Sequence, residues 1–216
     1  MSNVVVRRVE SKKDLKKFVK VPFHVHRDHP EWVPPLIMER MDFLNRKKNP
    51  YFDHAEVELV IAERDGVPVG RISAQIDDRW DEYRGGNDGQ FGFFETIDDA
   101  EVANALLDAG CEWLAGKGRE KVYGPMDFTT NDEIGIQIEG FDIRPVILEN
   151  CHQPYVKDLV EGNGFTKAMD LLMWHLEMGK LAKGLEFHPA IMEAAQKSLD
   201  EHGITDHSGF KVETTA

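Results

Sequence analysis

Hydrophobic and polar positions alternate most regularly in EVELVIAERDGVPVGRISAQID, residues 56–77. Two runs rich in β-branched residues flank Asp65-Gly66, a dipeptide that readily takes the positive φ angles of a tight hairpin turn. The pattern therefore predicts an antiparallel pair of strands. FGFFETI, residues 91–97, predicts a third strand, and KVYGPM, residues 121–126, predicts a short buried one.

The N-terminal region predicts one strand and two helices. The strand is VVVRRVE, residues 4–10, and Ser11 with Asp14 can cap the helix that follows it. Pro22 should end this helix, because proline lacks the N–H that the helix interior needs. WVPPLIMERMDFL, residues 32–44, predicts a second helix entered through its two prolines.

Later segments alternate between loops, helices and a last strand. The charged, glycine-rich residues 78–89 predict a loop. After FGFFETI, a helix stopped by Gly116 and Gly118 has one apolar face, formed by Val102, Leu106, Ala109, Trp113 and Leu114. Residues 150–161 predict a further helix, and residues 167–178 predict a strand after a turn at Asn163.

This order of elements predicts an α/β fold. Because the hairpin precedes the alternating strands and helices, the central sheet should be mixed rather than purely parallel, with helices flanking it. Residues 1–178 should form this domain. Residues 179–216 combine a linker, a helix predicted over residues 189–201 and a polar tail, and so predict a C-terminal helical extension.

Charge and composition narrow the class of protein. Among 216 residues, 39 acidic and 26 basic side chains give a formal charge of −13, which disfavours binding to nucleic acid or to an anionic membrane. No window approaches the roughly 18 apolar residues of a membrane span, and the N-terminus lacks a signal-peptide pattern, so we expect a cytoplasmic protein. The two cysteines, Cys111 and Cys151, form no disulfide framework.

Several motifs resemble the GCN5-related N-acetyltransferase (GNAT) superfamily. The hairpin, with Val69-Gly70 beginning its second strand, is similar to the central hairpin of that superfamily, and LVEGNGFTKAMDLLMWHLEM, residues 159–178, is similar to its C-terminal helix, turn and strand. A closer resemblance is to a bacterial group of GNAT-like proteins, and four segments carry it: HRDHPEWVPPL, NPYFDHAE, FGFFE and VYGPMDF. Proteins of this group usually carry a second GNAT-like half, so the resemblance implies that residues 179–216 correspond to the start of a truncated second half.

The resemblance implies a cofactor and a place for it. In the superfamily, the pantetheine arm of acetyl-CoA lies between the strands that correspond to residues 91–97 and 121–125. The residues implied at the cofactor are Phe93, Phe94, Thr96, Ile97 and Asn150. The acyl carbonyl would be polarised by main-chain N–H groups of the strand.

The resemblance also implies two catalytic residues. Glu95 corresponds to a general base that accepts the proton of the substrate amine. Val160 occupies the position where many members carry a tyrosine that protonates the leaving thiolate, and valine cannot do this. Tyr155 is the nearby substitute.

One departure leaves two functions open. Asp98 and Asp99 lie where the superfamily has a glycine-rich pyrophosphate loop, and Asp98 with Glu101 would instead cap the following helix. The chain is either an acyl-CoA-dependent N-acyltransferase acting on a small amine or a non-catalytic binding and assembly module with the same fold. Exposed apolar surface left by an absent second half would favour a homodimer.

Two motifs raise metal chemistry, and we expect neither to bind a metal. HVHRDH, residues 24–29, fits a di-metal hydrolase string, but it follows an amphipathic helix instead of a buried strand and should form a surface loop. A cluster of Asp77, Asp78 and Asp81 would suit Mg²⁺-dependent nucleotide hydrolysis, a third alternative, although the interleaved arginines and glycines favour a solvated loop.

Overall fold

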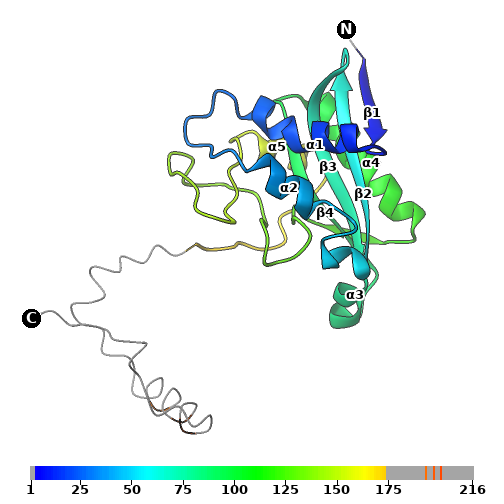
Figure 1. Ribbon diagram of the computed structural model, residues 1–216, viewed down its shortest axis with the longest axis vertical. Coiled ribbons are helices and arrows are strands. Elements are labelled where there is room, and N and C mark those ends of the chain that lie inside the picture. The colour runs from blue at the N-terminus through cyan, green and yellow to red at the C-terminus, as the bar shows by residue number, and fades with distance from the viewer. Residues whose placement is uncertain (1–2, 174–192, 194–196, 198–199, 201–216) are drawn as a thin grey trace, which may run out of the picture. The chain divides into compact units, whose positions relative to one another are not determined.

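The protein is described by a computed structural model that covers residues 3–173 and residues 193, 197 and 200 (Figure 1). The chain divides into two compact units, Met1–Met169 and Asp170–Ala216. Residues 193, 197 and 200 are helical. The expected domain boundary at residue 178 and the rest of the expected extension lie outside the described residues.

The first unit contains one five-stranded sheet in the order β1-β2-β3-β4-β5. Its strands are β1 (Val4–Arg8), β2 (Ala55–Arg64), β3 (Val67–Asp77), β4 (Asp88–Thr96) and β5 (Lys121–Tyr123). The first four strands are antiparallel, whereas β4 and β5 are parallel, so the predicted mixed sheet is confirmed. Asp65 and Gly66 make the predicted hairpin turn with φ angles of 53° and 77°.

Helices flank this sheet. They are α1 (Lys12–Val25), α2 (Ile37–Phe43), α3 (Asp78–Arg84), α4 (Ala100–Gly116) and α5 (Val156–Gly162), with a 3₁₀ turn, η1, at Pro50–Asp53. The α1 and α2 helices pack against one face of the sheet, and α4 and α5 pack against the other (Figure 1). The α/β fold expected from the sequence, a mixed central sheet flanked by helices, is confirmed by this order of strands and helices.

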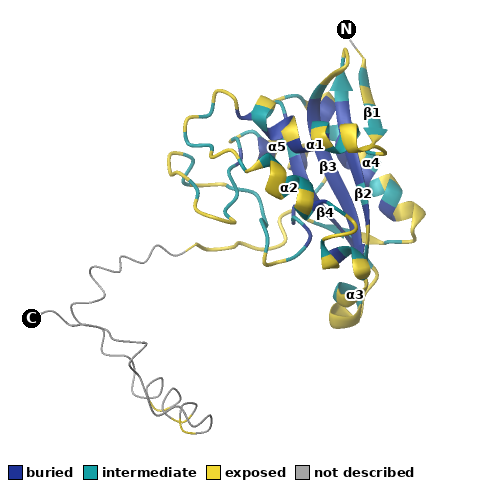
Figure 2. Ribbon diagram, viewed as in Figure 1, coloured by how far each residue is buried: buried dark blue, intermediate teal, exposed yellow. Residues whose placement is uncertain are grey.

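Strand alternation explains why both faces are covered. On β2, Leu59 and Ile61 are buried with Phe18 of α1, whereas Val60 and Ala62 are buried with α4. Successive side chains of a strand point to opposite faces, so a strand that is apolar at consecutive positions needs a layer on each side. Figure 2 shows the resulting band of buried residues along β2, β3 and β4.

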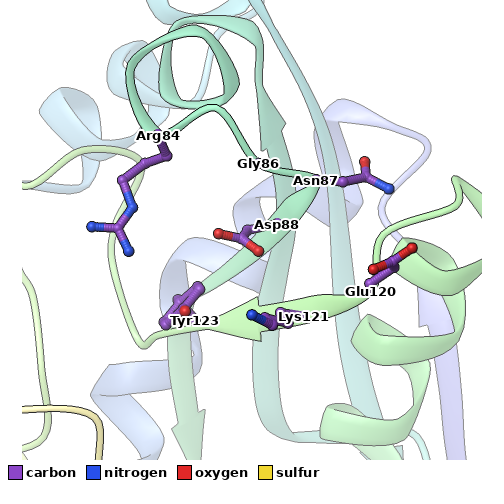
Figure 3. Close-up of a pocket in the computed structure, with 7 residues that line it drawn as sticks. All are labelled: Arg84, Gly86, Asn87, Asp88, Glu120, Lys121 and Tyr123. Carbon is purple, nitrogen blue, oxygen red and sulfur yellow. The ribbon is translucent and has the colours of Figure 1, made fainter.

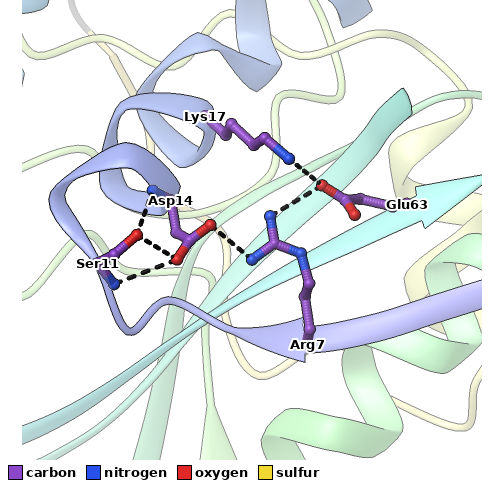
Figure 4. Close-up of polar contacts among 5 residues, drawn as sticks. All are labelled: Arg7, Ser11, Asp14, Lys17 and Glu63. Atoms are coloured by element: carbon purple, nitrogen blue, oxygen red, sulfur yellow. Dashed lines mark hydrogen bonds and ion pairs between the residues drawn. The ribbon is translucent and has the colours of Figure 1, made fainter. Parts of the chain in front are cut away.

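A polar cluster fixes the start of α1 against the sheet (Figure 4). Ser11 and Asp14 form the predicted capping box. Arg7 of β1 donates hydrogen bonds to Asp14 and to Glu63 of β2, both at 2.8 Å, and Lys17 donates to Glu63 at 2.9 Å. The hydrogen bond from Arg7 is the largest influence that lowers the pKa of Glu63, to about 2, so this carboxylate is ionised near neutral pH.

Two expectations for the first half of the chain are wrong. Pro22 does not end the first helix, which continues to Val25, because Pro22 is buried with Val21 beneath the sheet and packing outweighs the missing hydrogen bond. The stretch expected to be a loop over residues 78–89 instead contains α3 and the start of β4. Asp77 caps α3 by accepting from the Arg79 N–H at 2.9 Å, and Gly85 closes it with a φ of 63°.

Two expectations for the later part are also wrong. The helix expected over residues 150–161 begins only at Val156. Gln153 precedes a proline, which disfavours helical backbone there. The strand expected over residues 167–178 is not formed in its described part, because residues 165–173 are neither helix nor strand, and its remainder lies outside the described residues.

Candidate active site

One face of β3 carries a row of buried polar side chains. Arg71, Ser73 and Gln75 alternate with Ile72 and Ala74, and all five are buried. The Ser73 hydroxyl donates to Gln75 Oε1 at 2.7 Å, and Gln75 Nε2 donates to the Met126 carbonyl at 2.7 Å. Buried polar groups need partners, so this row anchors the chain that follows β5.

Glu95 of β4 lies beside this row and is paired with a histidine from α1. His26 Nε2 lies 2.7 Å from Glu95 Oε2, and the two side chains are 1% and 14% exposed. His26 ends α1, where its main-chain N–H donates to the Pro22 carbonyl at 2.8 Å. The helix therefore reaches Glu95 only because it continues past Pro22.

An indole holds the ring of His26 in place. Trp32 stacks on it with ring centroids 5.2 Å apart and an interplanar angle of 14°. His26 Nδ1 is buried and has no hydrogen-bond partner among the described residues. The imidazole of His26 therefore uses only Nε2, the atom that faces Glu95, in a side-chain contact among the described residues.

The surroundings of Glu95 keep its carboxylate ionised. Burial acts to raise the pKa of Glu95, but the charge and hydrogen bond of His26, followed by the charge of Arg71, outweigh burial and lower that pKa below its ordinary value. Arg71 Nη2 lies 3.9 Å from Glu95 Oε1. Burial in turn lowers the pKa of Arg71, whose guanidinium also lies over the Phe18 and Phe93 rings.

A second buried histidine reaches the same region from the segment before α5. The Gln137 N–H donates to His152 Nδ1 at 3.2 Å, and the His152 N–H donates to Gln137 Oε1 at 3.0 Å. Burial lowers the pKa of His152. Because His152 Nδ1 accepts a hydrogen bond, the neutral ring carries its proton on Nε2, and this N–H is a donor.

Cys151 is beside this histidine, and the geometry does not make it a nucleophile. Cys151 Sγ lies 3.5 Å from His29 Nδ1. Burial, with Glu95 and Glu31, raises the pKa of Cys151 to about 11, and burial lowers the pKa of His29. A thiol with this pKa carries almost no thiolate near neutral pH, and the thiolate is the reactive form.

The strands β4 and β5 pair for only three residues before the chain changes course. The register pairs Asp88, Gly89 and Gln90 with residues 121–123. Beyond it, the Met126 N–H donates to the Phe91 carbonyl at 2.8 Å. A Cβ on Gly92 would lie 2.0 Å from the Met126 carbonyl oxygen, so main chain itself fills the space between the strands at this point.

The next main-chain N–H of β4 is held by a carboxyl group. Phe93 has a φ of 48° at a bulge between β3 and β4, and its N–H donates to Asp127 Oδ1 at 2.5 Å. Burial and the nearby Glu133 raise the pKa of Asp127 to about 7. Glu133 pairs with Arg40 of α2, which ties α2 to the segment after β5.

The residues expected at the cofactor lie in different surroundings, some in the core and one in a hydrogen-bonded loop. Phe93 and Phe94 are buried in opposite layers of the core, so only their main chain faces the edge of β4. Thr96 is buried, and the Ile97 N–H donates to the Val69 carbonyl at 3.1 Å. Asn150 Nδ2 donates to the Gly135 carbonyl at 2.9 Å and to the Ile134 carbonyl, and so fixes the loop.

Tyr155, the candidate acid, reaches the edge of β4. Its hydroxyl donates to the Thr96 carbonyl at 2.8 Å. Burial, with Glu95 and Asp98, raises the pKa of Tyr155, so the phenol keeps its proton near neutral pH. The structure therefore brings Tyr155, Glu95 and His152 to one end of β4, and the catalytic roles expected for Glu95 and Tyr155 remain predictions.

The start of α4 differs from the sequence expectation in its capping residue. Asp99, not Asp98, is the N-cap, and it accepts from the Glu101 and Val102 N–H groups at 2.9 and 3.2 Å. Arg64 donates to Asp99 at 2.5 Å and to Glu101 at 2.8 Å. Two of the N–H groups that could bind a diphosphate at this helix end are therefore already used by Asp99.

The motifs that raised metal chemistry are dispersed. His24 is exposed, whereas His26 is buried against Glu95. Asp77 caps α3 and lies 2.9 Å from His54 Nδ1, and Asp81 pairs with Arg119. Within the part of the chain that the structure describes, no group of three or more histidine, cysteine, aspartate or glutamate side chains is arranged to hold a metal.

A polar pocket lies around the start of β4 (Figure 3), whereas Glu95 is close to the end of that strand. It has a volume of about 360 Å³, and its lining includes Arg84, Asp88, Lys121 and Tyr123. None of the residues expected at the active site or cofactor lines it.

Among the described residues, no helix is long and apolar enough to cross a membrane.

Sequence reasoning missed His26, Arg71 and His152. Arg71 had a detectable signal, because RISAQ places polar residues at alternate positions of a strand whose other face is apolar. His26 lay in the HVHRDH motif, which was interpreted as a surface loop because Pro22 predicted that the helix would end before it. His152 was hidden inside a segment interpreted as a helix.

The chain is similar in sequence to two curated proteins, and no family model matches it. It is 41% identical over 167 residues to the bacterial ceramide synthase of Caulobacter vibrioides, a match that covers 77% of this chain and 44% of that protein. It is 38% identical over 187 residues to protein YghO of Escherichia coli, covering 87% of this chain and 47% of that protein. The chain is similar to part of a ceramide synthase. It spans a little under half the length of each relative.

Solved structures with a similar arrangement share little sequence with this chain. An aminoglycoside acetyltransferase from a soil metagenomic sample matches with a TM-score of 0.48 and 13% identity, over 81% of this chain and 95% of that one. A predicted acetyltransferase of Clostridium acetobutylicum, solved with acetyl-CoA, matches with a TM-score of 0.47 and 11% identity, over 80% of this chain and 96% of that one.

Proposed function

We propose that this chain carries the catalytic site for transfer of an acyl group from acyl-CoA to the nitrogen of a long-chain amine. The observation that carries the proposal is the buried pair of Glu95 Oε2 and His26 Nε2, 2.7 Å apart, on the strand next to the parallel partner β5. A buried, ionised carboxylate is costly to hold without charged or hydrogen-bonding partners, and carboxylates with such partners gather at functional sites.

The chemistry of amide formation explains the task. An amine near neutral pH is protonated, and its nitrogen must lose protons to attack a thioester carbon and leave a stable amide. Glu95 is the proton acceptor in this proposal. The contact with His26 fixes the orientation of the carboxylate and shares its charge.

The relatives support the class of reaction and the class of acceptor. A ceramide is a long-chain amine whose nitrogen carries a fatty acyl group, so an enzyme named ceramide synthase forms an amide on a lipid. We therefore propose a long-chain amine as the acceptor, in place of the small amine expected from the sequence. Since the chain spans 44% of that relative, the proposal concerns the site that this chain carries.

Tyr155 is the proposed donor to the leaving thiolate. Its phenol keeps its proton near neutral pH, and its hydroxyl lies on the edge of β4 at the Thr96 carbonyl. Release of that hydrogen bond would free the hydroxyl to protonate sulfur. Val160, the position where a tyrosine was expected from the resemblance, is buried in the core with α4 and has no acid group.

The residues at α4 do not fit the diphosphate of acyl-CoA. Asp99 uses the N–H groups of Glu101 and Val102, and Asp98 adds a second carboxylate beside it. Two carboxylates oppose a diphosphate electrostatically. Acyl-CoA is therefore proposed only as the acyl donor, with its diphosphate away from the start of α4.

The experiment measures acyl transfer from a fatty acyl-CoA to a long-chain amine by mass spectrometry of the amide. Glu95→Gln should lower the rate by at least about 100-fold, because it removes the proton acceptor and keeps the shape. Glu82→Gln, an exposed change on α3, should leave the rate unchanged. Equal rates for Glu95→Gln and the original chain would reject the assignment of Glu95.

A binding module is the second candidate, and two observations favour it. Asp99 closes the start of α4, and the main chain of Met126 fills the space beside Gly92. Isothermal titration with acetyl-CoA, and with free CoA as control, separates the candidates. Binding near micromolar concentration supports the enzyme, whereas the absence of heat and of a thermal shift at millimolar ligand supports the module.

A further inference from the structure

Two surface connections beside the candidate active site expose a large number of aliphatic side chains. One connects α1 to α2, and the other connects β5 to α5. The exposed aliphatic residues in and next to these connections are Val33, Leu36, Met38, Ile138, Ile143, Val146, Ile147 and Leu148. Ile147 is 91% exposed, and single exposed apolar residues are ordinary whereas a group of eight is not. We call these eight side chains the aliphatic rim.

Two contacts show that the connections lie side by side. Cys151 Sγ at the end of one lies 3.5 Å from His29 Nδ1 in the other. Arg40 of α2 pairs with Glu133 at the start of the second connection. The same two connections carry His26 and His152, so the segments that present the rim also reach the Glu95 pair.

Local hydrogen bonds keep the aliphatic side chains of the second connection outside. The Val146 N–H donates to Glu149 Oε2 at 2.5 Å, and the Glu149 N–H returns a bond to the Val146 carbonyl at 3.2 Å. Leu148 between them has a φ of 66°, a conformation that an L-residue adopts only when its surroundings impose it. The loop is therefore built to present Val146, Ile147 and Leu148 to the exterior.

We propose that the aliphatic rim inserts into the surface of a zwitterionic lipid bilayer, from which the long-chain amine enters the site. This inference rests on the proposed function, because a long-chain amine and its amide product reside in a bilayer. The charge of the chain, −13, disfavours an anionic surface, so the attraction comes from the aliphatic side chains.

Charges next to the rim agree with a neutral lipid surface. The second connection carries Glu139, Asp142 and Glu149 against Arg144. Proteins drawn to anionic lipids carry clusters of lysine and arginine, which this rim lacks over residues 138–149. Binding should therefore persist at high salt and weaken when anionic lipid is added.

The test is co-sedimentation of the 216-residue chain with phosphatidylcholine vesicles. The original chain should sediment with the vesicles. The double variant Val146→Ser/Ile147→Ser should bind at least about tenfold more weakly, because it removes two of the most exposed aliphatic groups. The matched control Val5→Ser/Val67→Ser changes two half-exposed valines elsewhere on the sheet and should bind like the original chain. Far-UV circular dichroism and a thermal melt check that each variant is folded.

Other occupants of the rim would give different results. A dimer in light scattering that Val146→Ser/Ile147→Ser dissociates, with no sedimentation on vesicles, would assign the rim to a second copy and overturn the proposal. Equal loss of binding in the two double variants would also overturn it. Binding that rises with anionic lipid and falls with salt would assign the attraction to charge instead.

A further variant separates this inference from the proposed function. Glu95→Gln should keep vesicle binding while losing acyl transfer, because Glu95 is not part of the rim. Val146→Ser/Ile147→Ser should keep transfer to a short, water-soluble amine and lose transfer to a long-chain amine presented in vesicles. Vesicle binding by a chain without any transfer activity would leave the rim supported and reject the proposed function.

Discussion

Glu95 of β4 and His26 at the end of α1 are 69 residues apart in sequence and are joined by a contact of 2.7 Å between Oε2 and Nε2. The pair is shielded by Trp32 and adjoins the guanidinium of Arg71. The same two side chains therefore hold α1 against the sheet and form the proposed catalytic pair.

The coupling within this pair is measurable. His26→Gln should destabilise the fold by about 3 kcal/mol, because it leaves a buried carboxylate with only the more distant Arg71 as counter-charge. Adding Glu95→Gln should recover part of this loss, since two amides can share a hydrogen bond without a buried charge. Urea denaturation of both single variants and the double variant gives the coupling energy, and additive effects would show that the residues are independent.

Because of Asp127, the free energy of unfolding should depend on pH above the pH range in which carboxyl groups usually titrate. Its folded pKa is raised to about 7 by burial and Glu133, so the folded state holds a proton that the unfolded state loses near pH 4. The stabilising contribution is complete below pH 4 and is lost as the pH rises from 4 to 7. The groups that set this balance are Glu133, Arg71 and Arg40.

Comparison with Asp127→Asn isolates this effect. The asparagine oxygen can still accept from the Phe93 N–H and does not titrate. The variant should gain up to about 4 kcal/mol over the original chain between pH 4 and pH 8. Thermal melts at several pH values measure the difference, and parallel pH profiles for the two proteins would contradict the raised pKa.

Asp99 and Asp98 should differ in their effect on α4. Asp99→Ala should cost about 1 kcal/mol, because the N-cap hydrogen bonds to Glu101 and Val102 are lost, whereas Asp99→Ser should cost less because serine also caps. Asp98→Ala is the matched control and should have little effect. Chemical denaturation compares the three variants, and an equal cost for Asp98→Ala would contradict the observed cap.

Gly92 should tolerate no side chain. A Cβ there would lie 2.0 Å from the Met126 carbonyl oxygen and 2.6 Å from its carbon, both of which are main-chain atoms. Gly92→Ala should therefore destabilise the fold by about 3 kcal/mol or more, as measured by urea denaturation. Gly116→Ala is the control, because a Cβ at this position at the end of α4 would have nothing within 4 Å, and it should be neutral or slightly stabilising.

The predicted elements succeed where the local signal agrees with packing. The Asp65-Gly66 turn, the capping box at Ser11 and the apolar face of α4 were all predicted, because each depends on residues within one turn or one helix. Residues 78–84 form a short helix but were interpreted as a loop. This helix has no buried residue, so its charged sequence has no apolar face and is also typical of a loop.

Sequence alone determined the alternation of strands and helices, the mixed sheet and Glu95 as a candidate, since these follow from side-chain periodicity and from motif resemblance. Only the tertiary structure decided which residues meet Glu95. Burial of Pro22 and Val21 beneath the sheet carries α1 past its expected end to His26, and packing around Gly92 closes the strand gap at Met126. Both outcomes depend on contacts between residues distant in sequence, whose free energies exceed the local preferences that sequence patterns record.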